Sequence, residues 1–202
     1  PTEQDKLLNA LATPERLLVM ASRYTVFEGG ARKLARYQQY FAVEEILQRV
    51  EQVQADGRRR GGLIWHTQGS GKSLTMVMLA EALLQRFAAL SPKIVLVTDR
   101  VDLDDQIYGT FKASGVDTQQ ANTGRHLLEL LQSPRTEVIT TLLQKFEAAV
   151  NARDAALDSS NIFVLVDEGH RSHSGQFHAA LRRMLPNACF LGFTGTPVFK
   201  SQ

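Results

Sequence analysis

The fold is decided by residues 63–73, which read Leu63-Ile64-Trp65-His66-Thr67-Gln68-Gly69-Ser70-Gly71-Lys72-Ser73. The first three residues form an apolar run typical of a buried strand, and apolar residues recur at helical spacing after Ser73. Gly69 and Gly71 let the backbone N–H groups of the loop turn inward and approach an anion closely. The start of the following helix adds a favourable dipole. The stretch therefore predicts a phosphate-binding loop that joins a strand to a helix.

Each part of this loop has an expected role. We expect Lys72 to neutralise the β and γ phosphates of ATP and the Ser73 hydroxyl to ligate Mg2+. His66 stands where the general pattern has its first glycine, so the match is not strict. A glycine-rich turn without a ligand is the alternative, but the strand–loop–helix context argues against it. The residues whose backbone would bind the phosphates are Gln68, Gly69, Ser70 and Gly71.

A second motif follows the apolar run 162–166, where Asp167 and Glu168 leave a predicted buried strand. Ligands of open α/β sheets bind at the carboxyl ends of the strands, so both carboxylates belong to that edge. We expect Asp167 to hold Mg2+ through water and Glu168 to orient and deprotonate an attacking water. Such a pair is common by itself. Together with the loop it indicates nucleotide hydrolysis, with Lys72, Asp167 and Glu168 as catalytic residues.

Three further polar residues are weaker candidates. Gln39 lies in an Arg-x-x-Gln-x-x-Ala pattern, where its amide can present a donor and an acceptor to adenine. Arg100 and Thr141 each follow a predicted strand, at loop positions suited to contacts with the phosphate backbone of DNA. Polar loop residues need no such role, so these assignments are interpretations of position.

The sequence Thr194-Gly195-Thr196-Pro197 forms a third motif after the acidic pair. We expect His170 to link the hydrolysis site to Thr194 and Thr196. A metal cluster of His170, His173 and His178 is the alternative reading. Their spacing matches no common zinc pattern, and no cysteine supports it.

The chain alternates between strand and helix patterns. Continuous apolar strands separated by helices predict an α/β domain with a mainly parallel sheet covered on both faces, in three layers. Upstream, residues 14–22 read as a helix and 24–27 as a short strand. Strand candidates are 62–65, 93–98, 137–140, 161–166 and 188–193. Helical patterns span 36–53, 73–89, 103–111, 125–131, 142–151 and 177–185.

The bulk composition excludes several classes of protein. A chain of 202 residues with 44% hydrophobic residues has enough apolar surface for one α/β domain, which argues against disorder. The net charge of +2 neither predicts nor excludes a nucleic-acid partner. Cys189 is the single cysteine, so no internal disulfide forms, which fits a reducing compartment. With no apolar stretch of about 20 residues, we expect a soluble, cytoplasmic protein.

Together these motifs resemble those of the first RecA-like motor domain of superfamily 2 helicases and translocases. The wording is similar to that of the R (motor) subunit of type I restriction enzymes, above all at 65–73, 99–106, 144–146 and 167–172. In that family His66 is an expected residue. Leu142 and Gly169 depart from the usual wording, but neither touches the expected chemistry. By motif, the resemblance places Gln39 in the adenine-sensing motif, 69–73 in motif I, 97–106 in Ia, 138–146 in Ib, 167–170 in II and 194–197 in III.

The resemblance implies a RecA-like P-loop NTPase domain over residues 34–202, with residues 1–33 as a linker from a preceding nuclease domain and a second motor domain outside this chain. It implies ATP-driven translocation along double-stranded DNA before remote DNA cleavage. The implied partners are the methyltransferase and specificity subunits of a restriction complex. Two other classes stay open: another superfamily 2 DNA or RNA helicase and, with less support, a P-loop kinase, which has no use for 194–197.

Overall fold

A six-stranded parallel sheet forms the centre of the computed structural model, with strand order β3-β8-β7-β4-β6-β5. Every neighbouring pair in the sheet runs parallel, as the sequence predicts. The structure describes residues 2, 4, 5, 8, 12–28, 30–67, 69–135, 137–152, 157–167 and 181–195. The strands are β3 (Gly62–Trp65), β4 (Lys93–Thr98), β5 (Thr118–Gln120), β6 (Val138–Leu142), β7 (Ile162–Asp167) and β8 (Cys189–Thr194).

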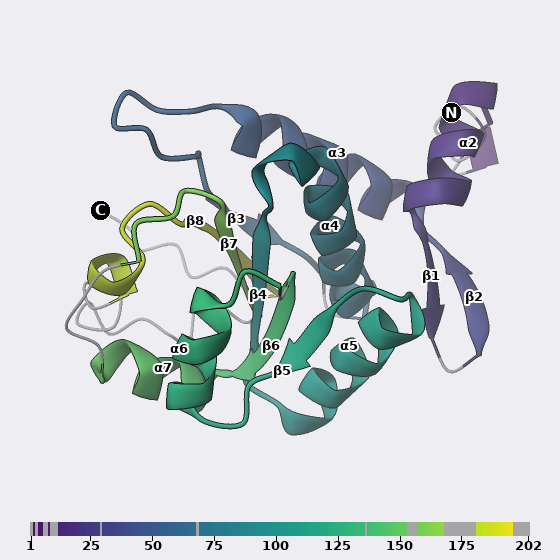
Figure 1. Cartoon of the computed structure of the whole chain (residues 1–202). Coiled ribbons are helices and arrows are strands. Elements are labelled where there is room, and N and C mark those ends of the chain that lie inside the picture. Colours follow the sequence, from purple (N-terminus) through teal and green to yellow (C-terminus); the bar gives the residue numbers. More distant parts are fainter. Residues whose placement is uncertain are drawn as a thin grey trace.

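Helices cover both faces of this sheet (Figure 1). One face carries α3, α4 and α5; the other carries α6, α7 and the helical residues 181–184. None of the described helices is long and apolar enough to cross a membrane. The bounds are α2 (Pro14–Arg23), α3 (Tyr37–Glu51), α4 (Lys72–Arg86), the short 3-10 helix η1 (Ala88–Leu90), α5 (Val101–Ala113), α6 (Gly124–Gln132) and α7 (Leu143–Asn151).

The central strands β4 and β7 are continuously apolar because they are covered on both sides. The edge strand β3 is not the buried strand expected from its sequence, since Leu63 is 58% exposed and Trp65 is 68% exposed. In β4, Ile94 and Leu96 belong to the cluster under α3, α4 and α5, whereas Val95 and Val97 belong to the cluster under α6 and α7. All four side chains are at most 1% exposed. Alternate residues of one strand therefore fill two separate cores, which is the pattern of a central strand in a parallel sheet.

A separate antiparallel hairpin, β1 (Thr25–Glu28) and β2 (Ala31–Leu34), lies beside the sheet with α2 (Figure 1). Its strand β1 contacts α4 and α5, and α2 contacts α4. Met20, Tyr24 and Val26 are buried in the same cluster as α3 and α4, and the Tyr24 hydroxyl donates a hydrogen bond to Glu44 over 2.6 Å. This N-terminal stretch therefore packs into the core of the domain. Its role as a linker over residues 1–33 stays a prediction.

Candidate nucleotide-binding site

The glycine-rich loop lies between β3 and α4, at the carboxyl ends of the strands. Gly69 and Gly71 have φ angles of 75° and 89°, in the left-handed region that disfavours any side chain. A Cβ atom on Gly71 would also lie 2.8 Å from the amide nitrogen of Gln39. Gly71 is the N-cap of α4 and has no side chain of its own to compete with an anion for the first N–H groups of the helix.

The structure brings Lys72 and Asp167 together. The Lys72 ammonium lies 2.8 Å from the Oδ1 atom of Asp167, and the two side chains are 19% and 4% exposed. Asp167 is the last residue of β7, and β7 lies one strand away from β3 across β8. The sheet therefore delivers a cation from the loop and a carboxylate from β7 to one point.

Ser73 follows Lys72 in α4, and Thr194 is the last residue of β8, the strand between β3 and β7. Ser73 is half-buried in the first turn of α4. Thr194 is buried at the end of β8, and its carbonyl accepts a 2.8 Å hydrogen bond from the His66 N–H at the root of the loop. A serine hydroxyl and a carboxylate are oxygen donors of the kind Mg2+ prefers, so the chemistry of Ser73 and Asp167 fits that ion.

Gln39 reaches the loop from α3. Its amide nitrogen donates to the Gly71 carbonyl and to the Thr75 hydroxyl, each over 3.1 Å. Its amide oxygen accepts from the Arg36 N–H over 2.9 Å, and the residue is 4% exposed. Gln39 thus contacts the phosphate loop directly, while its contact with adenine stays a prediction.

His66 makes two side-chain contacts that the sequence analysis did not predict. Its Nδ1 atom lies 2.6 Å from the Ser70 hydroxyl, and its Nε2 atom lies 2.9 Å from the Thr75 hydroxyl. Burial lowers the pKa of His66, and the nearby Lys72 charge adds to this effect, while a hydrogen bond with the Thr67 backbone opposes it. The sequence did hint at these contacts, because His66 is a bulky, hydrogen-bonding residue where the general loop pattern has glycine.

Arg100 and Thr141 lie at the same sheet edge, because β4 pairs with β6 and Val97 is opposite Thr141. Arg100 is the N-cap residue of α5. Its exposed guanidinium is paired with Asp102 over 2.7 Å. Thr141 lies within β6, Val138–Leu142, and not in the loop position expected after a strand ending at residue 140. It is buried, and its hydroxyl donates to the Leu142 carbonyl over 3.4 Å. Their contacts with DNA remain predictions. Four predicted site residues lie outside the described residues: Gln68, Glu168, His170 and Thr196.

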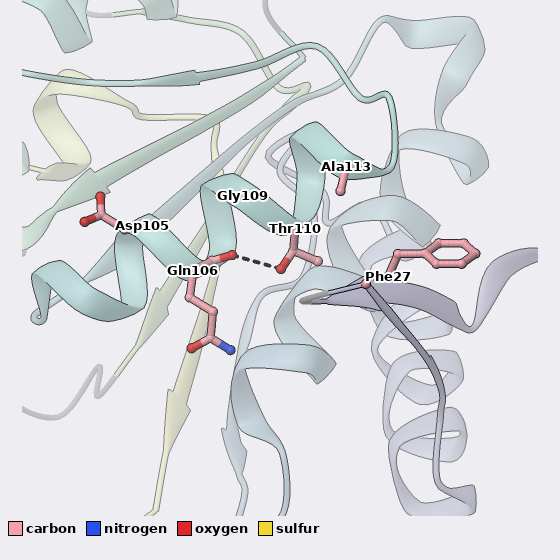
Figure 2. A pocket seen from close by; sticks show the side chains of 7 residues that line it. Phe27, Asp105, Gln106, Gly109, Thr110 and Ala113 are labelled. Atoms are coloured by element: carbon pink, nitrogen blue, oxygen red, sulfur yellow. Dashed lines mark hydrogen bonds between the residues drawn. The ribbon is translucent and has the colours of Figure 1, made fainter.

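A groove lies away from the loop, between the β1–β2 hairpin and α5 (Figure 2). Figure 2 shows Gln106 and Thr110 joined by a hydrogen bond, in which the Thr110 hydroxyl donates to the Gln106 carbonyl over 2.8 Å. The Phe27 ring extends away from α5 and is 49% exposed. None of the residues that line this groove comes from the phosphate loop, so it is separate from the candidate site.

The parallel sheet and its helices have the fold of the RecA-like domains of superfamily 2 helicases, as predicted. The UvsW helicase of bacteriophage T4 aligns with a TM-score of 0.62 over 91% of this chain and 60% of that chain, at 19% identity. A DNA-bound nuclease-deletion mutant of the type ISP restriction-modification enzyme LlaGI aligns with a TM-score of 0.58 over 83% and 18%, at 17% identity.

More particularly, the chain belongs to the SWI2/SNF2 ATPase family, which matches residues 38–202. It is 39% identical to the type I restriction enzyme HindI endonuclease subunit of Haemophilus influenzae, over 97% of this chain and 21% of that subunit. The chain is thus a homologue of type I restriction endonuclease subunits over their SWI2/SNF2 ATPase region. It spans about a fifth of the length of the curated relatives it matches.

Proposed function

We propose that this domain binds ATP with Mg2+ at residues 68–73 and hydrolyses it. Lys72 neutralises the β and γ phosphates, and Ser73 and Asp167 hold the metal ion. Glu168 orients the attacking water and accepts its proton. The observation that supports this proposal best is the 2.8 Å contact between Lys72 and Asp167 at the N-terminus of α4.

The same contact suggests what happens when ATP enters. Phosphate oxygens compete with the Asp167 carboxylate for Lys72, because a triphosphate brings more negative charge and the dipole of α4 favours it. Asp167 would then hold Mg2+ through water. A bound Mg2+ would act as a Lewis acid on the phosphate oxygens, while Lys72 balances the remaining negative charge. The exchange keeps both partly buried side chains paired in each state.

For the longer protein we propose ATP-driven translocation along double-stranded DNA, followed by remote cleavage. The names of the relatives support this proposal, as does the likeness to a restriction-modification enzyme bound to a DNA substrate mimic. In this proposal Arg100 and Thr141 contact DNA, and His170, Thr194 and Thr196 couple hydrolysis to movement. The methyltransferase and specificity subunits would be its partners. Residues 34–202 would form the first motor domain, with residues 1–33 as its linker.

A second candidate is a superfamily 2 helicase that separates strands. The structural similarity to the UvsW helicase, with a TM-score of 0.62, supports this second candidate. The two functions differ in one measurable product. A duplex translocase displaces a third strand from a DNA triplex and leaves the duplex intact, whereas a helicase releases single strands from the duplex. The longer protein should therefore be tested with both substrates.

Binding is tested by calorimetric titration of the chain with Mg2+ and a non-hydrolysable ATP analogue. Lys72→Ala removes the charge that faces the phosphates and is expected to abolish measurable binding. Lys112→Ala is a matched control, because it removes an exposed lysine near the end of α5. Unchanged affinity in the Lys72→Ala variant would exclude the loop as the nucleotide site.

A further inference from the structure

The His66 ring spans the inside of the phosphate loop. One ring nitrogen contacts Ser70, at the tip of the loop, over 2.6 Å. The other contacts Thr75, in the second turn of α4, over 2.9 Å. The Ser70 hydroxyl is also bonded to the Thr67 carbonyl. His66 therefore ties the tip of the loop to the helix that follows it.

Thr75 is the point where two such ties meet. It is fully buried, and its hydroxyl also contacts Gln39 from α3 and the carbonyl of Gly71, each over 3.1 Å. Gly71 O in turn accepts from the Gln39 amide over 3.1 Å. His66, which follows β3, and Gln39, which lies in α3, thus both contact the Thr75 hydroxyl of α4. The result is a continuous hydrogen-bonded brace, composed of Gln39, His66, Ser70 and Thr75.

The root of the loop is fixed as well. The His66 N–H donates to the Thr194 carbonyl over 2.8 Å, and the indole N–H of Trp65 donates to the Gly195 carbonyl over 3.2 Å. With the root held by β8 and the tip held by the ring, the loop has little freedom to collapse. A binding loop that is ordered before its ligand arrives loses less conformational entropy on binding.

We propose that His66 is a positioning residue that holds the phosphate loop in its receptive shape, through Ser70 and Thr75, for any ligand carrying a polyphosphate. This inference rests on the proposed nucleotide site and deepens it. Because His66 bonds to the loop and to α4, it acts on the phosphate part of the ligand and is indifferent to the base. Loss of the His66 ring is therefore expected to lower the affinities for ATP, GTP and inorganic tripolyphosphate by a common factor.

The test compares the affinities of the chain for these three ligands with Mg2+, measured by calorimetry in wild type and variants. His66→Ala removes both ties and is expected to raise each Kd roughly 5- to 50-fold. His66→Asn keeps a short polar side chain that reaches only one partner, so it should recover part of the loss. His126→Ala is the matched control, since His126 lies in α6, away from the loop. Ser70→Ala removes one tie with the ring in place and should give a smaller common loss.

The single tryptophan gives a readout independent of binding. Trp65 precedes His66, so its emission in the ligand-free chain should shift in His66→Ala and return toward wild type in His66→Asn. Equal Kd values for His66→Ala and wild type would overturn the inference, as would a loss confined to ATP. If His66→Ala does not fold, Ser70→Ala provides the test: unchanged Kd values, or a loss of affinity confined to ATP, would again overturn the inference. No binding by wild type itself would instead refute the proposed nucleotide site.

Discussion

Lys72 and Asp167 form an ion pair 2.8 Å long, with the aspartate 4% exposed and the lysine 19% exposed. Removing one partner of such a pair leaves the other charge poorly solvated, which typically costs about 3–5 kcal/mol when burial is complete. Asp167→Asn is therefore expected to lower the thermal stability of the ligand-free chain. It should also remove the gain in ATP affinity that Mg2+ provides, while Lys72 still binds phosphate.

Calorimetry with Mg2+ and with a chelator measures that gain directly. Asp102→Asn serves as the control, because Asp102 is a highly exposed aspartate in the neighbouring helix α5. A full Mg2+ effect in Asp167→Asn would move the metal site elsewhere.

Glu168→Gln in the longer protein is expected to leave ATP binding intact and to stop translocation. The amide keeps the size of the side chain and loses its capacity to accept a proton. Loss of a general base typically lowers the rate by about 10² to 10⁴. Steady-state ATPase rates and calorimetric binding on the same preparation separate the two effects. Normal turnover would assign the base to another residue.

The 202-residue chain by itself is expected to hydrolyse ATP very slowly, even with DNA present. In two-domain motors of the kind it resembles, the second domain supplies an arginine that stabilises charge on the transferring phosphate. Such an arginine is worth roughly 10³ to 10⁵ in rate in related enzymes. Any DNA binding should fall steeply with added salt. Robust DNA-stimulated turnover by this chain would show that it carries its own arginine finger.

Gln39→Leu is expected to weaken ATP and GTP binding together, because the amide bonds to Gly71 and Thr75 are lost in both cases. Unsatisfied buried partners cost about 1–3 kcal/mol, which corresponds to roughly a 5- to 150-fold loss of affinity if the cost falls on the binding-competent loop. The adenine contact predicted from the sequence adds a further loss for ATP alone. Competition titrations with ATP and GTP measure both the loss of affinity common to the two nucleotides and the further loss for ATP. Unchanged GTP affinity would remove Gln39 from the brace.

Glu81 is expected to make the stability of the chain depend on pH. Burial raises the pKa of Glu81 to about 7, against an ordinary value of 4.5, although a hydrogen bond with Ser114 opposes the shift. The folded state then binds more protons than the unfolded state between these values, so stability falls as pH rises from 4.5 to 7. Glu81→Gln should raise the free energy of unfolding at pH 8 by on the order of 1–3 kcal/mol and leave it unchanged near pH 4.

Chemical denaturation at the two pH values measures this difference. Glu45→Gln, an exposed glutamate on α3, is the control and should change neither value. A Glu81→Gln variant that gains nothing at pH 8 would contradict the raised pKa.

The central strands β4 and β7 were predictable because burial on both faces makes them continuously apolar. The predicted strands 62–65 and 93–98 have the bounds of β3, Gly62–Trp65, and β4, Lys93–Thr98, and the other apolar strands differ by one or two residues at their ends. β5 was missed, since Thr118–Gln120 has no apolar residue and borders only β6. The second hairpin strand, Ala31–Leu34, was missed because all four residues are exposed.

The strand order and the inside of the loop could not be predicted. Helical crossovers of similar length allow several orders, and only packing places β8 between β3 and β7. Motif spacing likewise identified Lys72 and Asp167 as candidates without fixing their contact. The brace at Thr75 depends on side-chain directions from three elements, and no periodic pattern records these directions. His66 carried a sequence signal, but its partners did not.

The position of β3 at the edge of the sheet has a consequence for the order of folding. Its partner in the described sheet is β8, and the bond from Trp65 to Gly195 spans 130 positions. At 5–20 residues per second, a ribosome would need roughly 6 to 26 s to make the chain between them. During that interval Leu63, Ile64 and Trp65 have no strand to pair with and resemble an aggregation-prone segment. We therefore expect β3, the strand that leads into the phosphate loop, to stay unpaired in the nascent chain until β8 has been made. Chaperones are expected to bind this segment during that interval.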